Sequence, residues 1–317
     1  MNLKECVAGY VEYRRSLGAK FVAGEAVLMT FARILGLESD VGGIGLDGVE
    51  RFLFGNRGVT ATSKTRRGIL QGFFRWLVIR GHAEGLPKIP DVSGDVQSLR
   101  PYIYTQDEVR ALLAASRTYQ RRRDLCLAYP ECVRMIVFLT YALGLRIRET
   151  LSLTLSDVHD GEMVLLVRET KFFKTRVVPY NACVARELGV FLEWRRKARL
   201  PRDPESLLFV DRRRAPMLYR NVLTIFHRLC EVAGIRRDDQ TRYGPRIHDL
   251  RHTFAVQRLT CWYREGRDVQ ALLPVLSTYL GHASIGGTSV YLTMTPCLLE
   301  AAGARFEGYV TGKGDDR

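Results

Sequence analysis

A proline- and glycine-rich stretch near the end of the first third of the chain most limits what these 317 residues can form. Residues 85–103 hold three prolines and two glycines and show little hydrophobic periodicity. Such a composition interrupts helices and strands and is typical of a linker. We therefore predict two domains, residues 1–85 and 104–317, joined by a linker over residues 86–103.

The first domain is predicted to be helical throughout. Apolar residues recur at helical spacing over residues 3–17, 22–35 and 62–80. A short helix is expected around residues 49–53, after a glycine-rich loop. These helices are enough to enclose a small core.

The second domain is predicted to be mainly helical with one small antiparallel β-hairpin or sheet. A helix is expected over residues 131–144, and the pattern over residues 182–300 is mostly helical. Two β-branched runs, MVLLV at 163–167 and RVVPY at 176–180, flank the turn KFFKT. Two such runs joined by a short turn are typical of a hairpin.

Charge indicates a polyanionic partner. The chain has 48 Lys and Arg against 34 Asp and Glu, a net charge of +14, and most of the excess lies in residues 99–317. Nucleic acid is the commonest polyanionic partner of a basic protein, although a basic surface without a dedicated partner is the alternative.

Cysteine usage and hydropathy indicate the compartment. The seven cysteines are scattered and contain no C-x-x-C pair, so neither a disulfide framework nor a thiolate zinc site is expected. The N-terminus lacks the order of a signal peptide, and no apolar run approaches the length of a membrane span. We expect a cytoplasmic protein with no membrane partner.

Two local patterns place cationic donors where they can bind an oxyanion. Arg146 follows a predicted helix end, and Glu149, three residues on, can hold its guanidinium. In IHDLRHTF, His248 and Arg251 share one helix face, which suits a phosphate. His248 and His252 have the i, i+4 spacing of some metal sites, but a third ligand is not evident, so we expect no metal and a structural role for one of the two histidines.

A third pattern, LGHASIGGTSVYLTM, puts His282 nine residues before Tyr291 with small and polar residues between them. A lone tyrosine is ordinarily part of a core or an interface. The hypothesis that Tyr291 is a nucleophile therefore depends on the whole set of residues.

Taken together, these residues resemble the tyrosine recombinases, the phage integrase family, which cut and rejoin DNA through a phosphotyrosine. The boxes of the family correspond to GLRIRE, to HDLR and to LGH with its downstream tyrosine. A hairpin lysine, usually in G-K-G-x-K-x-R-x-V-P, corresponds to Lys171 in TKFFKTRVVP. The match covers about residues 105–300, and the N-terminal helices fit the family's core-binding, SAM-like domain less specifically. The positions that the resemblance makes catalytic are Arg146, Lys171, His248, Arg251, His282 and Tyr291.

The resemblance implies a mechanism without metal, ATP or other cofactor. Tyr291 would attack a DNA phosphodiester and form a 3′-phosphotyrosyl link. Arg146 and Arg251 would bind the non-bridging oxygens with help from the two box histidines, and Glu149 would support Arg146. Lys171 would protonate the departing 5′-oxygen as the general acid.

The hairpin departs from the family pattern, because Thr170 and Phe172 replace glycines on either side of Lys171. Lys174 is therefore an alternative general acid. The stretch between the second and third boxes also looks longer than usual, and Pro274 interrupts its helical pattern. This segment is a candidate for remodelling the flank of the site or a subunit contact.

Several basic residues outside the boxes are candidates for contacts with DNA phosphates, which position a protein without reading sequence. For the cluster at the start of the 62–80 helix, a solvated helix face is the alternative. The candidates are Lys64, Arg66, Arg67, Lys174 and Arg176.

The predicted function is that of a site-specific recombinase of a mobile element, acting in integration, excision or transposition. The alternatives are a type IB topoisomerase-like monomer and a catalytically silent DNA-binding scaffold or repressor. The predicted partners are double-stranded DNA, other copies of the chain in a tetramer, and other recombinases. In the family, a helix like the one that Thr295 and Pro296 begin docks on a neighbouring protomer, and an intramolecular contact is the alternative.

Overall fold

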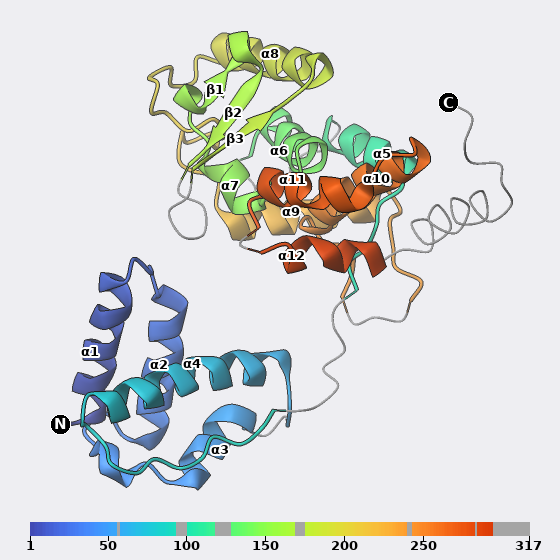
Figure 1. Ribbon diagram of the computed structural model, residues 1–317. Helices are drawn as coiled ribbons and strands as arrows, with labels where there is room; N and C mark the ends of the chain where they lie inside the picture. The colour runs from blue at the N-terminus through green and yellow to red at the C-terminus, as the bar shows by residue number, and fades with distance from the viewer. Residues whose placement is uncertain are drawn as a thin grey trace, which may run out of the picture. The chain divides into compact units, whose positions relative to one another are not determined.

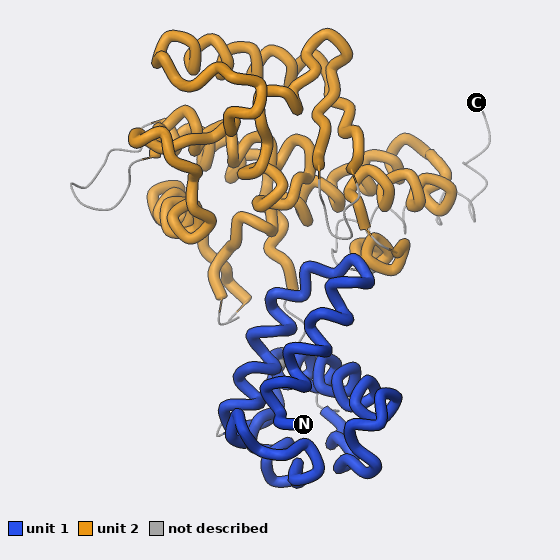
Figure 2. Tube along the Cα trace, turned by 90° about the vertical axis from the view of Figure 1, so that its left-hand side faces the viewer, with its two compact units in different colours: residues 1–99 blue, residues 100–317 orange. Residues whose placement is uncertain are grey.

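The computed structural model describes residues 1–55, 58–92, 100–117, 128–168, 175–239, 243–282 and 284–293. The chain divides into two compact units, residues 1–99 and 100–317 (Figure 2), and each has a hydrophobic core of its own. Across the described ranges, we find no helix that is both long enough and apolar enough to cross a bilayer.

Unit 1 is helical, as the periodicity predicts. Asn2 forms a capping box with Glu5 at the start of the first helix, and Thr60 forms one with Ser63 at the start of the last. Its elements are α1 (Leu3–Ser16), α2 (Val22–Leu35), the 3-10 turn η1 (Val41–Gly43), α3 (Leu46–Phe54) and α4 (Ala61–Ile79).

The core of unit 1 combines aliphatic side chains with several buried aromatic rings. Phe31, Phe52 and Phe73 are fully buried, and Phe31 meets Phe52 edge to face with ring centroids 5.0 Å apart. The first part of the predicted linker packs against this unit: Arg67 donates from Nε to the Pro90 carbonyl at 3.0 Å.

Unit 2 is a helical bundle with a small sheet, which confirms the predicted fold class. In Figure 1 the three strands lie beside α8 at one end of the unit. The described helices are α5 (Gln106–Arg117), α6 (Pro130–Ala142), α7 (Ile147–Ser152), α8 (Ala182–Lys197), α9 (Tyr219–Val232), α10 (Asp249–Arg264), α11 (Val269–Leu280) and α12 (Gly286–Ser289). Short 3-10 turns are η2 (Leu155–Asp157), η3 (Asp160–Glu162) and η4 (Val290–Thr293).

The sheet is antiparallel in the order β1-β2-β3, with β1 (Val158–His159), β2 (Val164–Val167) and β3 (Arg176–Pro179). Leu165 pairs with Val178, and both are fully buried. The predicted pairing of the two β-branched runs is therefore confirmed, and residues 169–174, which hold most of the predicted turn, lie outside the described residues. The sequence did not reveal β1, because two residues are too few to show a period.

Pro274, which interrupts the helical pattern of the sequence, lies inside α11, and the helix runs through it to Leu280. A proline inside a helix removes one backbone hydrogen bond and costs about 3 kcal/mol. Leu273, Leu276 and Leu280 are buried in a cluster with Val256 and other residues of α10. Burial on both sides of the proline stabilises the helix enough to offset that cost.

Candidate active site

The first arginine of the site begins a helix. Arg146 is the N-cap of α7, and its backbone N–H donates to Glu149 Oε2 at 3.0 Å. Its guanidinium donates from Nη1 to Glu149 Oε1 at 2.7 Å and from Nη2 to the Gly281 carbonyl at 2.9 Å. The GLRIRE box is thus tied directly to the LGH box.

The second arginine is the more deeply buried. Arg251, on α10, is 1% exposed and donates from Nη1 to the Gly144 carbonyl and from Nη2 to the Leu280 carbonyl, both at 2.7 Å. Arg146 Nη1 also lies 3.4 Å from the Leu280 oxygen, so both guanidinium groups meet at one carbonyl. Burial and the charge of Arg146 lower the pKa of Arg251 to about 10, which leaves it charged at neutral pH.

Two glycines allow this close approach. Gly144 (φ +60°) and Gly281 (φ +66°) both have left-handed backbone. A Cβ at Gly144 would lie 2.5 Å from a ring carbon of Phe254, and one at Gly281 would lie 2.8 Å from Arg176 Nη1. A larger residue would therefore displace the Phe254 ring at the first position or the Arg176 guanidinium at the second.

One carboxylate joins Arg146 to the hairpin. Glu149 is 7% exposed and accepts hydrogen bonds from Arg176 Nη1 at 3.0 Å and from Arg176 Nη2 at 2.8 Å. Burial alone would raise the pKa of Glu149, but the hydrogen bonds and charge of Arg176 and the hydrogen bonds of Arg146 lower it to about 2. Arg176 also donates from Nε to the Tyr279 carbonyl at 3.0 Å, which links β3 to α11.

Three half-buried histidines, His248, His252 and His282, form what we call the histidine cluster. Burial, together with nearby positive charge, lowers the pKa of each imidazole to about 4. All three are therefore neutral at pH 7 and can act as hydrogen-bond donors and acceptors. The rings of His248 and His252 meet edge to face at 5.0 Å, and His282 Nδ1 lies 2.7 Å from Thr288 Oγ1.

The predicted nucleophile lies in the same place. Tyr291, in η4, is 3% exposed, and its hydroxyl oxygen is 3.1 Å from His252 Nδ1. The ring of His282 stacks on the Tyr291 ring, with centroids 6.2 Å apart. Burial raises the pKa of Tyr291, while the charges of Arg251 and Arg146 act in the opposite direction.

The structure thus brings together five of the predicted site residues from segments far apart in sequence, namely Arg146, His248, Arg251, His282 and Tyr291, with the supporting Glu149. Lys171 and Lys174 lie outside the described residues. In the described part of the chain, no three metal-ligating side chains are arranged so that they could hold a metal ion, and this includes the histidine cluster.

The predicted phosphate contacts differ in their surroundings. Lys64 is exposed on α4. Arg66 donates to the Phe52 carbonyl at 2.7 Å, and the guanidinium of Arg67 lies 3.3 Å from the Asp91 carboxylate. Arg176 is bound within the site by Glu149 and is largely buried. Their contacts with DNA remain predictions.

Sequence reasoning missed the contact between His252 and Tyr291. The signal available was a second histidine directly after the HDLR box, on the helix face next to that of Arg251. It also missed the salt bridge between Arg176 and Glu149, which the sequence indicates only through the opposite charges of the two residues.

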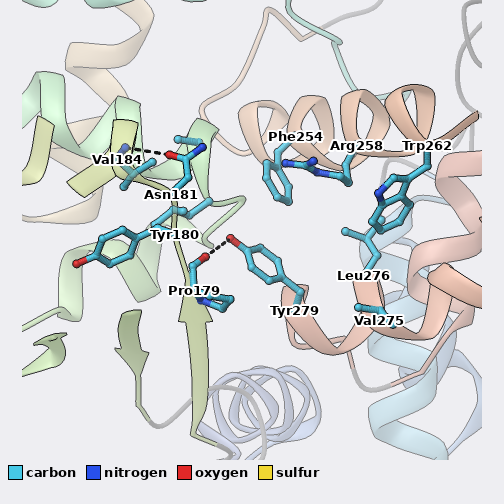
Figure 3. Close-up of a pocket in the computed structure, with 12 residues that line it drawn as sticks. Pro179, Tyr180, Asn181, Val184, Phe254, Arg258, Trp262, Val275, Leu276 and Tyr279 are labelled. Carbon is cyan, nitrogen blue, oxygen red and sulfur yellow. Dashed lines mark hydrogen bonds between the residues drawn. The ribbon is translucent and has the colours of Figure 1, made fainter. Parts of the chain in front are cut away.

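Unit 2 also contains an open pocket of about 340 Å³ between β3, the start of α8, α10 and α11 (Figure 3). Its walls are largely aromatic and aliphatic, and Tyr279 donates from its hydroxyl to the Pro179 carbonyl at 3.4 Å. The lining residues are Ala142, Leu143, Pro179, Tyr180, Asn181, Val184, Phe254, Arg258, Trp262, Val275, Leu276 and Tyr279.

Comparison with known proteins agrees with this geometry. The profile of the phage integrase family matches residues 103–296. The chain is 31% identical over 309 residues to "Putative integrase/recombinase y4rB" of Sinorhizobium fredii, covering 96% of this chain and 97% of that one. It is 33% identical over 230 residues to the tyrosine recombinase XerA of Thermococcus kodakarensis, covering 71% of this chain and 68% of XerA.

The fold is also shared. The structure of the Tn1549 transposon integrase in complex with a circular intermediate DNA is similar, with a TM-score of 0.69, 18% identity and coverage of 97% of this chain and 99% of that chain. Fold and relatives together define a class, the tyrosine-type site-specific recombinases. Within that class, this chain belongs to the phage integrase family.

Proposed function

We propose that this recombinase cuts and rejoins double-stranded DNA through a 3′-phosphotyrosyl link to Tyr291. The observation that carries the proposal is the position of the Tyr291 phenol, in the same chain and the same buried site as Arg251 and Arg146. A free tyrosine is a poor nucleophile at neutral pH, and nearby guanidinium charge favours its phenolate. Burial raises the pKa of Tyr291 overall, and the charges of Arg251 and Arg146 act against that rise. We therefore assign Tyr291 as the nucleophile and the two arginines as the charges that favour its phenolate.

The two arginines are assigned to the reacting phosphate. A phosphodiester gathers negative charge on its non-bridging oxygens during displacement, and preformed cationic donors stabilise that charge more in the transition state than in the ground state. Carbonyl oxygens of Gly144, Leu280 and Gly281 fix both guanidinium groups before DNA binds. Because a guanidinium has five N–H donors, these described bonds leave donors for a phosphate.

The leaving group also needs a proton. We assign Lys171 as the general acid for the 5′-oxygen, with Lys174 as the alternative, on the resemblance of TKFFKTRVVP to the family hairpin. Arg176 and Glu149 support this assignment, because they tie the start of β3 to the arginine site. The phosphotyrosyl link keeps the energy of the broken bond, so rejoining needs no ATP.

DNA is the proposed partner because the chain carries a net charge of +14 and because solved relatives were studied on DNA, among them the λ integrase dimer bound to a core site. We assign unit 1 the role of a core-binding domain. Lys64 is its best candidate for a phosphate contact, since its side chain is exposed. Arg66, Arg67, Lys174 and Arg176 are secondary candidates.

We further propose that copies of the chain assemble on DNA as a tetramer and exchange the segment after Thr293. The apolar pocket beside Trp262 and Leu276 is the surface assigned to that segment, because CLLEAAGARF is rich in apolar residues. Removing residues 294–317 and replacing Trp262 by glutamate should each weaken assembly on DNA, as measured by native mass spectrometry. Assembly that survives both changes would favour an intramolecular contact of the tail.

Covalent capture tests the main proposal. The protein is incubated with nicked duplexes that carry fragments of its source genome. The nick lets the cleaved strand end diffuse away, so that the covalent adduct is trapped and can be recovered after denaturation. Wild-type protein should capture a specific sequence, and Tyr291→Phe should bind the same DNA without forming an adduct. Binding without any adduct by wild type would support a scaffold, and relaxation of arbitrary supercoiled plasmid by a monomer would support a topoisomerase.

The biological setting is proposed from the relatives and the composition. Inverted repeats beside the gene would support a role in a mobile element. The cysteines of the described residues are free thiols, as expected in the reducing cytoplasm that we assign to the chain.

A further inference from the structure

We propose that His252 is a catalytic residue that accepts the hydroxyl proton of Tyr291 as the phenolic oxygen attacks phosphorus. This inference rests on the proposed function, because it concerns the same strand-cleavage step. It assigns a role to a residue outside the family boxes, in the turn of α10 that also carries Arg251.

The geometry distinguishes His252 from the other members of the histidine cluster. Its Nδ1 is 3.1 Å from the Tyr291 hydroxyl oxygen, and the two rings are tilted by 59° at a centroid distance of 5.5 Å. His282 presents the face of its ring to Tyr291, and its Nδ1 is taken by Thr288 at 2.7 Å. His248 packs edge to face against His252. Of these rings, His252 is the one aimed at the reacting oxygen.

Burial makes this contact effective. Tyr291 is 3% exposed, so bulk water has little access to its hydroxyl. A nucleophile in such a site needs a fixed acceptor for its proton, and a histidine nitrogen within hydrogen-bond distance is a suitable one. His252 also orients the hydroxyl, which leaves a lone pair free for the phosphorus.

The charge state of His252 suits an acceptor. Burial, followed by the charges of His248, Arg246 and Arg251, lowers the pKa of His252 to about 4, against the opposing effect of Asp249. These groups face it from α10 and the turn before it, and Tyr291 faces it from η4. The imidazole is thus neutral at pH 7. A bound phosphate adds negative charge beside it, and this favours the imidazolium when the proton arrives.

The step balances. The Tyr291 oxygen forms a bond to phosphorus while its proton moves to His252 Nδ1, and the bond from phosphorus to the 5′-oxygen breaks as that oxygen takes a proton from the general acid. In the reverse step the 5′-hydroxyl attacks the phosphotyrosine and gives its proton to the deprotonated general acid. His252 then returns its proton to the Tyr291 oxygen.

The test compares two versions of the duplex that the covalent capture identifies. One has the native 5′-oxygen as leaving group, and the other has a 5′-bridging sulfur, which leaves without needing a proton. His252→Asn keeps an acceptor near the position of Nδ1 but cannot carry the proton, and it should slow single-turnover cleavage of both substrates by about 100-fold or more. Non-covalent DNA affinity should stay the same. His159→Asn, an exposed change on β1, is the matched control and should cleave like wild type.

Lys171→Ala supplies the contrast, since a general-acid variant should regain most of its rate with the sulfur leaving group. The proposal is overturned if His252→Asn cleaves within about threefold of wild type, or if sulfur restores its rate as it restores Lys171→Ala. In the second case His252 would act on the leaving group.

A measurement without DNA separates this inference from the proposed function. Nitrogen-15 NMR of the histidine side chains at pH 7 should show His252 Nδ1 unprotonated and hydrogen-bonded, with the proton on Nε2. Tyr291→Phe should remove the hydrogen-bond shift and keep the fold. A protonated Nδ1 would refute the inference, whereas the absence of any covalent adduct with wild type would refute the proposed function.

Discussion

Replacing Glu149 by glutamine tests the buried charge network that holds the arginines. Glu149 accepts hydrogen bonds from the backbone and Nη1 of Arg146 and from two nitrogens of Arg176. Glutamine has nearly the same shape, but its amide N–H groups would face guanidinium N–H groups. Arg176, whose side chain is 11% exposed, would then carry a nearly buried charge without its carboxylate.

The pKa of Glu149 sets the magnitude. Lowering this carboxyl pKa from 4.5 to about 2 corresponds to about 3 kcal/mol in favour of the ionised, folded form. Because the folded pKa is the lower one, this stabilisation is fully present above pH 4.5 and is lost as the pH falls through about 2. At pH 7, Glu149→Gln should therefore lower the free energy of unfolding by about 3 kcal/mol and Tm by about 6–12 °C.

Urea denaturation of both proteins, followed by circular dichroism at pH 7, measures the difference. Glu193→Gln is the matched control, because a hydrogen bond from Arg196 lowers the pKa of Glu193 to about 2 as well, but that carboxylate is exposed. Water and salt screen the exposed pair, so the control should unfold like wild type. Equal effects of the two changes, or a loss below about 1 kcal/mol for Glu149→Gln, would refute the reasoning.

Three further predictions concern the same unit. Gly144→Ala should destabilise the fold by about 2 kcal/mol or more, because the backbone there is left-handed and the new Cβ would meet Phe254. Gly161→Ala, whose Cβ would point into open space, should be tolerated, and thermal melts of the two variants make the comparison. Arg251→Lys should slow adduct formation by about 100-fold or more in a single-turnover assay while DNA binding persists, and near-normal cleavage would contradict its assignment to the phosphate. The histidine cluster should make the free energy of unfolding fall as the pH falls from 6.5 to 4, and level off below pH 4. In that window each unfolded imidazole takes up a proton that the folded one, with a pKa of about 4, does not. Urea midpoints that stay flat across this window would count against the buried neutral state.

The sequence by itself determined most of the helices and the pairing of two strands, and its boxes identified the family. Apolar periodicity was enough for helices such as α2 and α4, and two β-branched runs predicted the pairing of β2 with β3. The resemblance of the boxes that hold Arg146, Arg251 and Tyr291 to those of the tyrosine recombinases implied phosphoryl transfer. Each of these signals comes from residues close together in the chain, so it can be recognised in one sequence without knowledge of the tertiary structure.

Only the tertiary structure decided how the boxes meet. Arg251 binds the carbonyl of Gly144, 107 positions away, and His252 reaches Tyr291 across 39 positions. Neither contact follows from hydrophobic spacing, because each depends on how α10 packs against α6 and η4. The continuation of α11 through Pro274 has the same origin, since burial in the packed unit outweighs a local preference. Propensity acts within a few residues, whereas the position of a buried charge depends on the partners that the whole fold brings to it.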